Sequence, residues 1–386
     1  MDEVPWTRRN AYPHVAPPWF LAVDRKGTVV ESLRHHRLGA LTDVPGYGCL
    51  IAVFRGLRVG LLAVTDDGAT LPVTPPDDEA SWSVQPTDKT DAIVLIRSAL
   101  DGSRRTASWT PTGGLTWPPL AEATVDSEAR DLAIRQISWL APGGTLDGLL
   151  ATPDGKGPFP LVVYLHGGPW FGLRVGDVGD TAFWTALGAA FLQSDYAGSG
   201  ILGEAMMWEP LRAVGMPDRD LDADGVLAGV AALIAAGVAD PDRLYVYGFS
   251  AGGYLVNPII TRPHPFTAAA SWDSTADVRI FDGETHRLQV FFRGCEPSEC
   301  PQRWDAASPI TRPEKVNIPV TIISGGGLTT HRVASTAWHT ALAEVGVPTD
   351  LHVYPEEEHV FAPQAHQSAL VLLAAAWSLT NPATSS

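Results

Sequence analysis

One stretch in the second half of the chain constrains the fold more than any other. Residues 245–254 read YVYGFSAGGY, a short apolar run of β-favouring residues that ends in Gly-x-Ser-x-Gly-Gly. An apolar run with helical spacing follows over residues 254–260. Strand, tight turn and helix in this order are the setting of a nucleophile elbow, in which a serine projects from a sharp turn at the edge of a sheet.

The proposed turn explains the glycines around Ser250. Strand and helix backbones nearly touch at such a turn, so the residues two before and two after the serine, Gly248 and Gly252, must lack a Cβ atom. Ser250 would then project from the carboxyl edge of a sheet, with the backbone N–H of Ala251 pointing into the same space. A bare Gly-x-Ser-x-Gly arises by chance in a long, Gly-rich chain, so the strand and helix around it make the motif informative.

Composition narrows the class of protein. The chain has 386 residues, of which 45% are hydrophobic and 18% charged, as expected of a soluble globular protein with room for two or three domains. Its formal net charge of −16 disfavours nucleic acid and anionic membrane surfaces as partners. The acidic amino terminus does not resemble a signal peptide, and the longest apolar runs are too short to span a bilayer. We therefore expect a cytoplasmic protein with reduced thiols, although Cys295 and Cys300 are close enough in sequence to pair.

Two regions differ in their hydrophobic pattern. Residues 1–128 contain short β-type runs broken by Asp-Gly and Pro-rich turns, which predicts a β-rich amino-terminal domain of hairpins. Over residues 129–386, short apolar runs alternate with helical patterns, which predicts a mostly parallel sheet with helices on both faces. Ligands of such α/β sheets bind beyond the carboxyl ends of the strands. In the first region we predict strands at 20–23, 49–54, 59–64 and 92–96; in the second, strands at 133–140, 146–152, 161–165, 189–193, 244–247, 266–272, 320–324 and 351–354, and helices at 221–235, after 250, at 333–345 and at 368–379.

Three features follow predicted strands and would therefore meet at one edge of the sheet. The segment His166-Gly167-Gly168-Pro169 follows the strand at 161–165, and its glycines would let backbone N–H groups face a cavity, as an oxyanion hole requires. Ser250 is the second feature. His359, on the loop after the last predicted strand, is the third, and among eleven histidines only its position singles it out. A serine hydroxyl is a poor nucleophile unless a base takes its proton, so an imidazole must reach Ser250.

The order of these features, a serine followed by a histidine after the final strand, is that of an α/β-hydrolase. From about residue 130 to the end, the chain also resembles the catalytic domain of the prolyl oligopeptidase family of serine peptidases. Within that family it is similar to the acylaminoacyl-peptidase and dipeptidyl-peptidase-like branch. The matching segments are 166–169, 240–244 leading into 248–254, 304–310, 318–320 and 354–361.

The resemblance implies a role for each matching residue. It implies that Ser250 is the nucleophile and His359 the general base. The implied oxyanion hole consists of the backbone N–H groups of Gly168 and Ala251. Arg332, in the retained Arg-Val pair at 332–333, and Tyr254 are assigned to substrate binding. No metal and no organic cofactor is implied, and the sequence has neither a Walker-type loop nor a dinucleotide fingerprint.

The sequence departs from the family at the third member of the triad. The family's acid is an aspartate in the loop after the strand that corresponds to 320–324. Here residues 325–333 contain no carboxylate. The aligned position is Thr330, or Leu328 if the alignment is shifted by one gap.

Three interpretations of this departure stay open. The acid has moved to Asp273, at the end of the strand at 266–272, although an aspartate there also suits a helix N-cap. Alternatively, a neutral acceptor such as Thr329, Thr330 or a backbone carbonyl orients His359. In the third interpretation the protein has lost turnover, because removing the acid from such a triad costs on the order of 10⁴ in rate.

Two further departures concern the surroundings of the site. The segment Asp195-Tyr196-Ala197-Gly198-Ser199-Gly200 has Ala197 where the family commonly has an arginine. Family members usually carry a seven-bladed propeller before the hydrolase domain. About 130 residues can form about three blades of 40 to 45 residues each, so we expect a truncated propeller or a different cap.

Together these features predict an α/β-hydrolase that cleaves an amide or ester bond of a small peptide-like substrate through an acyl-enzyme on Ser250. The alternatives are an esterase or acyltransferase in a tailoring pathway, and a catalytically silent binding protein that keeps the pocket. The expected partner is a small molecule or short peptide, with neither nucleic acid nor membrane. Self-association as a homo-oligomer is left open.

Overall fold

The computed structural model describes residues 37–44, 47–85, 92–118, 133–168, 171–199, 220–327 and 329–380. The chain divides into two compact units. The β unit comprises residues 1–136, 172–182 and 200–203, and the α/β unit comprises residues 137–171, 183–199 and 204–386. The boundary predicted between residues 128 and 129 lies outside the described residues. No helix in the described part of the chain is long and apolar enough to cross a membrane.

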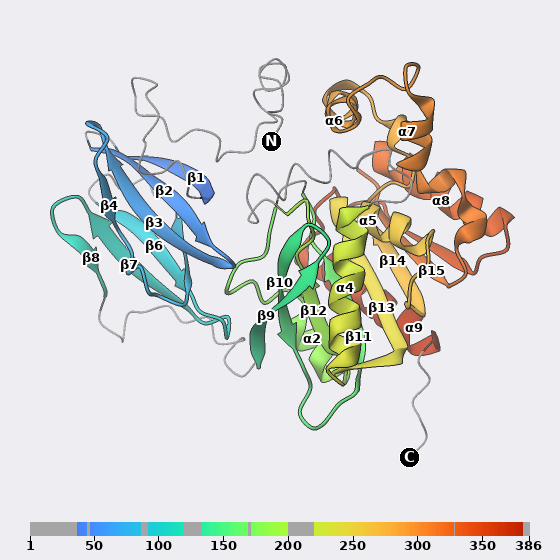
Figure 1. Cartoon of the computed structure of the whole chain (residues 1–386), viewed down its shortest axis with the longest axis horizontal. Coiled ribbons are helices and arrows are strands. Elements are labelled where there is room, and N and C mark those ends of the chain that lie inside the picture. Colours follow the sequence, from blue (N-terminus) through green and yellow to red (C-terminus); the bar gives the residue numbers. More distant parts are fainter. Residues whose placement is uncertain are drawn as a thin grey trace. The chain divides into compact units, whose positions relative to one another are not determined.

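The β unit contains two antiparallel four-stranded sheets, each with its strands in sequence order (Figure 1). The first sheet consists of β1 (Arg37–Val44), β2 (Gly48–Arg55), β3 (Arg58–Thr65) and β4 (Thr70–Pro72), and the second of β5 (Ser81–Gln85), β6 (Ile93–Ser98), β7 (Arg104–Thr110) and β8 (Gly114–Thr116). Leu50 and Leu61 of the first sheet and Trp82, Leu95 and Trp109 of the second are buried in one shared core. The β-rich amino-terminal domain is therefore confirmed. Four antiparallel strands in sequence order are also the pattern of a propeller blade, so the truncated propeller stays a prediction.

The sequence predicted β2, β3 and β6 of this unit but missed β1, β4, β5, β7 and β8. Strand β7 reads RRTASWT, and along it only Ala107 and Trp109 are buried. A strand with one solvated face alternates polar and apolar residues, so it lacks the continuous apolar run by which the other strands were found. The run predicted at 20–23 lies outside the described residues.

The α/β unit is built on a sheet of eight described strands in the order β16-β15-β14-β13-β11-β12-β10-β9 (Figure 1). Neighbouring strands from β12 to β16 run parallel, and β10 is antiparallel to β12. Every residue of β12, β14 and β15 is buried, which is why these strands read as apolar runs. The strands are β9 (Ile134–Ala141), β10 (Gly144–Ala151), β11 (Phe159–Leu165), β12 (Ala190–Ser194), β13 (Ala239–Phe249), β14 (Ala268–Trp272), β15 (Val320–Gly325) and β16 (Thr349–Tyr354).

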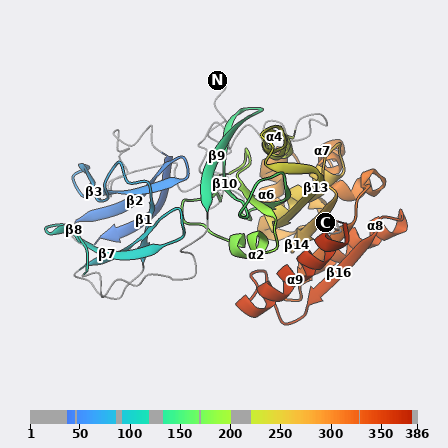
Figure 2. The same cartoon turned by 90° about the horizontal axis from the view of Figure 1, so that it is seen from below.

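Helices cover both faces of this sheet, as predicted. On one face Val230 of α4, Ile259 of α5 and Trp338 of α8 join one buried cluster. On the other face Trp184 of α2 and Leu373 of α9 join a second cluster. Figure 2 shows α2 and α9 on the side of the sheet opposite α4. The helices are α2 (Thr181–Ala186), α4 (Leu221–Ala235), α5 (Ala251–Ile260), α6 (Gly283–Arg293), α7 (Pro301–Ala306), α8 (Thr329–Glu344) and α9 (Pro363–Thr380), with 3₁₀ turns η5 (Val278–Ile280), η6 (Pro309–Thr311) and η7 (Pro313–Lys315).

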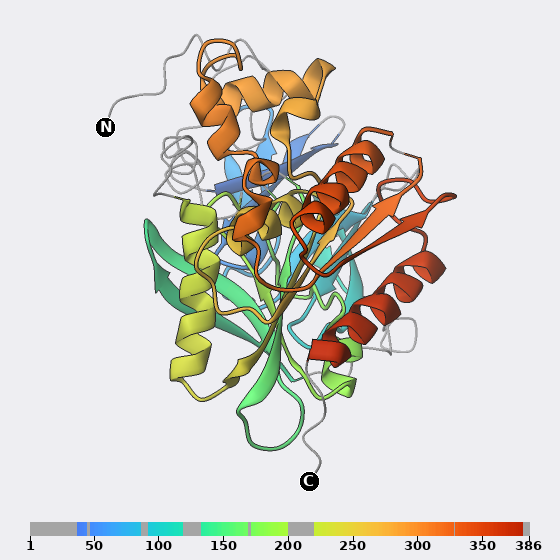
Figure 3. The same ribbon diagram turned by 90° about the vertical axis from the view of Figure 1, so that its right-hand side faces the viewer.

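Helices α6 and α7 were not predicted from the sequence. Figures 1 and 3 both show them at the end of the sheet where α5 begins. Cys295 and Cys300, between the two helices, form a disulfide. The expectation of reduced thiols at these two positions is therefore wrong. Charged and amide side chains interrupt the apolar residues of α6 (GETHRLQVFFR), so its sequence lacks the clear periodicity of α4.

The packing of α9 predicts unequal costs for two neighbouring truncations. Leu373 is 0% exposed in the second cluster, whereas Val371 on the same helix is 60% exposed. We expect Leu373→Ala to lower the free energy of unfolding by about 2–5 kcal/mol, because it leaves a cavity, and Val371→Ala to change it by less than about 0.5 kcal/mol. Urea unfolding followed by circular dichroism measures both. Equal midpoints for the two variants would contradict the packing of this face.

Candidate active site

Ser250 occupies a strained turn between β13 and α5. Its backbone angles are φ 55° and ψ −117°, outside the regions that a serine ordinarily adopts. A Cβ atom on Gly248 would overlap the carbonyl of Gly252, and one on Gly252 would overlap the carbonyl oxygen of Leu165. The steric need for both glycines is therefore confirmed. The N–H of Ser250 donates to the carbonyl oxygen of Trp272 over 2.9 Å, which ties the turn to β14.

The imidazole of His359 lies directly at this hydroxyl. Its Nε2 atom is 2.9 Å from the Oγ atom of Ser250, although the two residues are 109 positions apart in the sequence. His359 belongs to the loop that follows β16, and its ring packs against that of Phe249 with ring centroids 4.8 Å apart. The side chain is 29% exposed, so the imidazole is only partly shielded from solvent.

Asp273 receives the other nitrogen of this imidazole. Its side chain is fully buried, and its Oδ2 atom lies 2.5 Å from the Nδ1 atom of His359. The second oxygen, Oδ1, accepts hydrogen bonds from the hydroxyl of Ser324 over 3.1 Å and from the N–H of Gly325 over 2.9 Å. An ionised carboxylate only accepts, so Nδ1 of His359 carries the proton and Nε2 presents its lone pair to Ser250.

Asp273, like Ser250, has a positive φ angle. Its φ of 44° falls in the left-handed region, which aspartate tolerates better than most residues but at some cost. The conformation turns the carboxylate away from β14 and toward the end of β15. The N-cap alternative does not apply, because the next helical turn, η5, is capped by the side chain of Asp277.

The end of β15 and the loop after it hold glycines in the segment where the family has its acid. A Cβ atom on Gly325 would lie 2.7 Å from the carbonyl oxygen of Glu358, and one on Gly326 would lie 2.5 Å from the backbone of Pro355. Because these residues lack a Cβ atom, the loop that carries His359 can pack directly against the backbone at the end of β15. Thr330 lies in the first turn of α8, and Leu328 lies outside the described residues.

The glycine loop after β11 lies against the serine. A Cβ atom on Gly167 would lie 3.3 Å from the Cβ atom of Ser250. Gly168 has φ 104°, a conformation that favours glycine, and contacts Phe171. Ala251 is the first residue of α5, where backbone N–H groups have no partner within the helix. Pro169, the last residue of the predicted motif, lies outside the described residues.

His166, the first residue of this loop, is held in a buried polar cluster away from Ser250. Its Nε2 atom lies 2.8 Å from the hydroxyl of Ser199 and 3.3 Å from the carboxylate of Asp195. The ring of Tyr196 stacks on the imidazole at 4.4 Å, and its hydroxyl donates to the carbonyl oxygen of His166. Through these contacts with His166, the segment 195–199 holds the glycine loop in place.

A partly buried carboxyl group extends this polar cluster. Asp222, on α4, accepts a hydrogen bond from the N–H of Gly198 over 2.6 Å. Burial, reinforced by the neighbouring charge of Asp220, raises the pKa of Asp222 to about 7. Asp222 therefore changes between its neutral and its charged form near neutral pH.

Known proteins match both the sequence and this architecture. The description "Prolyl oligopeptidase family" belongs to the family model that matches residues 177–382, more than half of the chain. The chain belongs to the prolyl oligopeptidase family. Acylamino-acid-releasing enzyme 1 of Oryza sativa subsp. japonica is 26% identical over 324 residues, which cover 74% of this chain and 41% of the rice protein.

Solved structures place the α/β unit in the α/β-hydrolase fold of that family. Dipeptidyl peptidase 4 of Porphyromonas gingivalis superposes with a TM-score of 0.74 at 16% identity, covering 92% of this chain and 52% of that one. Acylaminoacyl peptidase of Pyrococcus horikoshii superposes with a TM-score of 0.73 at 15% identity, covering 91% and 57%. The chain spans less than half the length of the curated relatives that it matches.

His331, which lies beside the triad of this prolyl oligopeptidase family member, was not identified from the sequence. The ring of His331, on α8, packs against that of His359 with centroids 4.8 Å apart. Burial lowers the pKa of His331, and the charge of Asp273 partly opposes that shift. The available signal was its position, directly before the retained Arg332-Val333 pair in the segment where the family acid was sought.

The two predicted substrate-binding residues have different surroundings. The hydroxyl of Tyr254 donates to the carbonyl oxygen of Ala307 over 2.9 Å, and burial raises its pKa, so it stays a neutral donor. Arg332 lies on α8 with an exposed side chain. Their contacts with substrate stay predictions.

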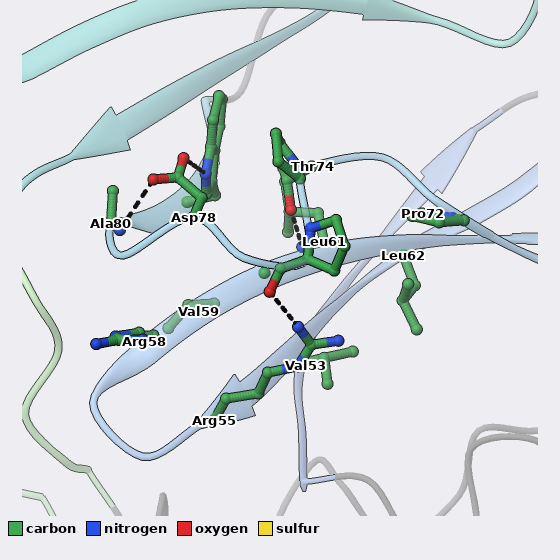
Figure 4. A pocket seen from close by; sticks show the side chains of 14 residues that line it. Val53, Arg55, Arg58, Val59, Leu61, Leu62, Pro72, Thr74, Asp78 and Ala80 are labelled. Carbon is green, nitrogen blue, oxygen red and sulfur yellow. Dashed lines mark hydrogen bonds between the residues drawn. The ribbon is translucent and has the colours of Figure 1, made fainter.

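A small pocket lies within the β unit (Figure 4). Residues between Val53 and Trp82 line it, and the guanidinium of Arg55 donates to the carbonyl oxygen of Pro76 at its rim. Its volume is about 130 Å³. Ligand pockets usually measure about 300 Å³ or more, so we assign no substrate to this pocket.

The contact of Tyr254 predicts the effect of removing its hydroxyl. We expect Tyr254→Phe to lower the free energy of unfolding by about 0.5–1.5 kcal/mol, because the Ala307 carbonyl loses its donor. Denaturant unfolding measures this cost, and steady-state kinetics measures KM for the same variant. A raised KM with unchanged stability would show instead that the hydroxyl serves the substrate.

Proposed function

We propose that this chain is a serine peptidase that cleaves an amide bond of a short peptide-like substrate through an acyl-enzyme on Ser250. One observation carries the proposal: a continuous hydrogen-bond chain runs from the hydroxyl of Ser250 through both nitrogens of His359 to the carboxylate of Asp273. Membership of the prolyl oligopeptidase family supports the same chemistry.

The first half of the reaction uses all three side chains. His359 Nε2 removes the proton as Oγ of Ser250 attacks the carbonyl carbon of the substrate. The imidazolium that forms is stabilised by the negative charge of Asp273, which is buried and held by Ser324 and Gly325. His359 then donates its proton to the leaving amine, and the C–N bond breaks to leave an ester on Ser250.

The second half repeats these steps with water. Nε2 of His359 takes a proton from a water molecule, whose oxygen attacks the ester carbon. The tetrahedral intermediate collapses, Ser250 recovers its proton from the imidazolium, and the free acid leaves. In both halves we assign the developing oxyanion to the N–H groups of Gly168 and Ala251. The position of Gly167 against Ser250 and of Ala251 at the start of α5 supports this assignment.

The names of the relatives suggest the class of substrate. The curated relatives of rice and Arabidopsis are named acylamino-acid-releasing enzymes. We propose that this chain likewise acts on a short peptide whose first residue carries an acyl group. The group bound to Ser250 in the acyl-enzyme could also pass to an acceptor other than water. Hydrolysis and transfer share this intermediate, so product analysis with competing nucleophiles is needed to separate them.

The catalytically silent alternative rested on the missing carboxylate after β15. Asp273 offers a carboxylate in hydrogen-bond contact with His359, so that argument loses its force. A neutral acceptor is likewise not needed to orient the imidazole. We therefore favour an active hydrolase with its acid at the end of β14.

The role of Ser250 predicts the outcome of active-site labelling. A fluorophosphonate probe should form an adduct with Ser250 of the native chain, because only a hydroxyl activated by a base attacks phosphorus rapidly. Ser250→Ala should give no adduct and no turnover of an N-acetylated aminoacyl p-nitroanilide. Intact-protein mass spectrometry detects the adduct. The absorbance of the released p-nitroaniline measures turnover. A native chain without adduct would favour the silent protein.

The position of the acid predicts a contrast between two substitutions. Asp273→Asn should lower kcat by about 10⁴, because an amide no longer stabilises the imidazolium or holds its tautomer. Thr330→Val, at the position aligned with the family acid, should lower kcat by less than about 3-fold, since the proton of His359 Nδ1 goes to Asp273. Steady-state kinetics with the same anilide compares them. A large loss only in Thr330→Val would place the orienting acceptor on α8.

A further inference from the structure

The side chains of Asp273, His331 and His359 converge in a way that the hydrolytic mechanism does not require. One oxygen and two ring nitrogens, one from each residue, lie within 4.8 Å of one another. Among the described residues searched, they are the one group of three such side chains that comes so close. We propose that these residues form a binding site for a divalent transition-metal ion, foremost Zn²⁺, and that the bound ion switches the hydrolase off.

The ligand set suits zinc better than the hard cations. Zinc binds imidazole nitrogen at about 2.0–2.1 Å and carboxylate oxygen at about 2.0–2.2 Å, commonly with four ligands. Adjacent ligands of a tetrahedral ion are then about 3.3 Å apart. The atoms at this site need to move by on the order of 1 Å to reach that geometry, which side-chain rotation can supply. Calcium and magnesium prefer sites made wholly of oxygen ligands.

The carboxylate of Asp273 is already oriented as a metal ligand. Oδ1 is occupied by the donors of Ser324 and Gly325, which leaves Oδ2 directed toward His359. Hydrogen bonds of this kind to a ligating carboxylate fix its direction and support metal binding. The whole side chain is 0% exposed, so its negative charge gains strongly from a cation beside it.

His331 supplies the ligand that the hydrolytic mechanism leaves unused. Its Nδ1 atom is buried and has no hydrogen-bond partner in the described structure. Buried polar atoms are usually paired, so an unpaired ring nitrogen beside a carboxylate calls for an explanation. The rings of His331 and His359 are packed together, so one ion can contact both.

Binding of the ion would remove the general base. The Nδ1 lone pair of His359 would bond to the metal, and the proton that Nδ1 carries would move to Nε2. The imidazole stays neutral, and no net proton is released. Nε2 then donates a hydrogen bond to Ser250 and can no longer accept its proton. This step rests on the proposed function, whereas metal binding itself does not.

Cobalt provides a direct probe of binding. Full-length chain, freed of metal with EDTA, is titrated with Co²⁺, which shows visible ligand-field absorption when bound in a tetrahedral site, and Zn²⁺ then displaces it. We expect His331→Gln to weaken the affinity for Zn²⁺ by at least about 10-fold, the lower end of what loss of a supporting group near a metal costs. His339→Gln, on the same helix α8, should bind as the native chain does. Equal affinity in both variants would overturn the site.

Two further measurements test whether the variant is folded and how many imidazoles bind the ion. Far-ultraviolet circular dichroism verifies that His331→Gln is folded, and X-ray absorption of the zinc-bound native chain counts imidazole ligands without any variant. Two imidazoles support the site, and none or one overturns it.

The switch is tested by the rate of fluorophosphonate labelling with and without Zn²⁺. We expect zinc to slow labelling of the native chain and of His339→Gln by at least about 10-fold, reversibly with EDTA, and to change the rate for His331→Gln by less than about 2-fold. Metal binding without slower labelling would overturn the switch. Absent labelling in the metal-free native chain would contradict the proposed function instead, while the cobalt spectra would still decide the site.

Discussion

The contact between the carboxylate of Asp273 and the imidazole of His359 is the interaction on which the rest of the site depends. A buried charge must be paired and hydrogen-bonded, and this one has three donors: the imidazole, the hydroxyl of Ser324 and the N–H of Gly325. Those donors hold together the ends of β14 and β15 and the loop after β16. Because Asp273 fixes the tautomer of His359, it also decides which nitrogen meets Ser250.

Close backbone packing makes this contact geometrically feasible. Gly248 and Gly252 let β13, α5 and the end of β11 approach each other at Ser250, and the glycines at 325–327 let the loop of His359 cross β15. Two residues other than glycine, Ser250 and Asp273, have positive φ angles in the described part of the chain. Both therefore carry backbone strain, and both lie at the site. Such strain is characteristic of functional residues and is sustained by the surrounding fold.

The parts of the fold that could be predicted are those with a local physical cause. Strands such as β14 and β15 are buried on both faces, so their burial is visible as continuous apolar sequence. The half-exposed strand β7 and the polar helix α6 lack that signal, and their contacts form only when distant segments pack against them. The disulfide between Cys295 and Cys300 was misjudged because the expectation rested on cellular compartment rather than on distance.

The sequence by itself determined the turn at Ser250, because a strand, two required glycines and a helix all fall within a few residues of it. It also nominated His359 from its place after the last strand. Only the tertiary structure decided where the acid lies, since 86 residues separate Asp273 from His359 and the sequence left three interpretations open. The same holds for His331, whose meeting with His359 depends on how α8 packs beside the sheet. Local spacing encodes backbone shape, whereas contacts between remote side chains arise only when the strands are assembled in order.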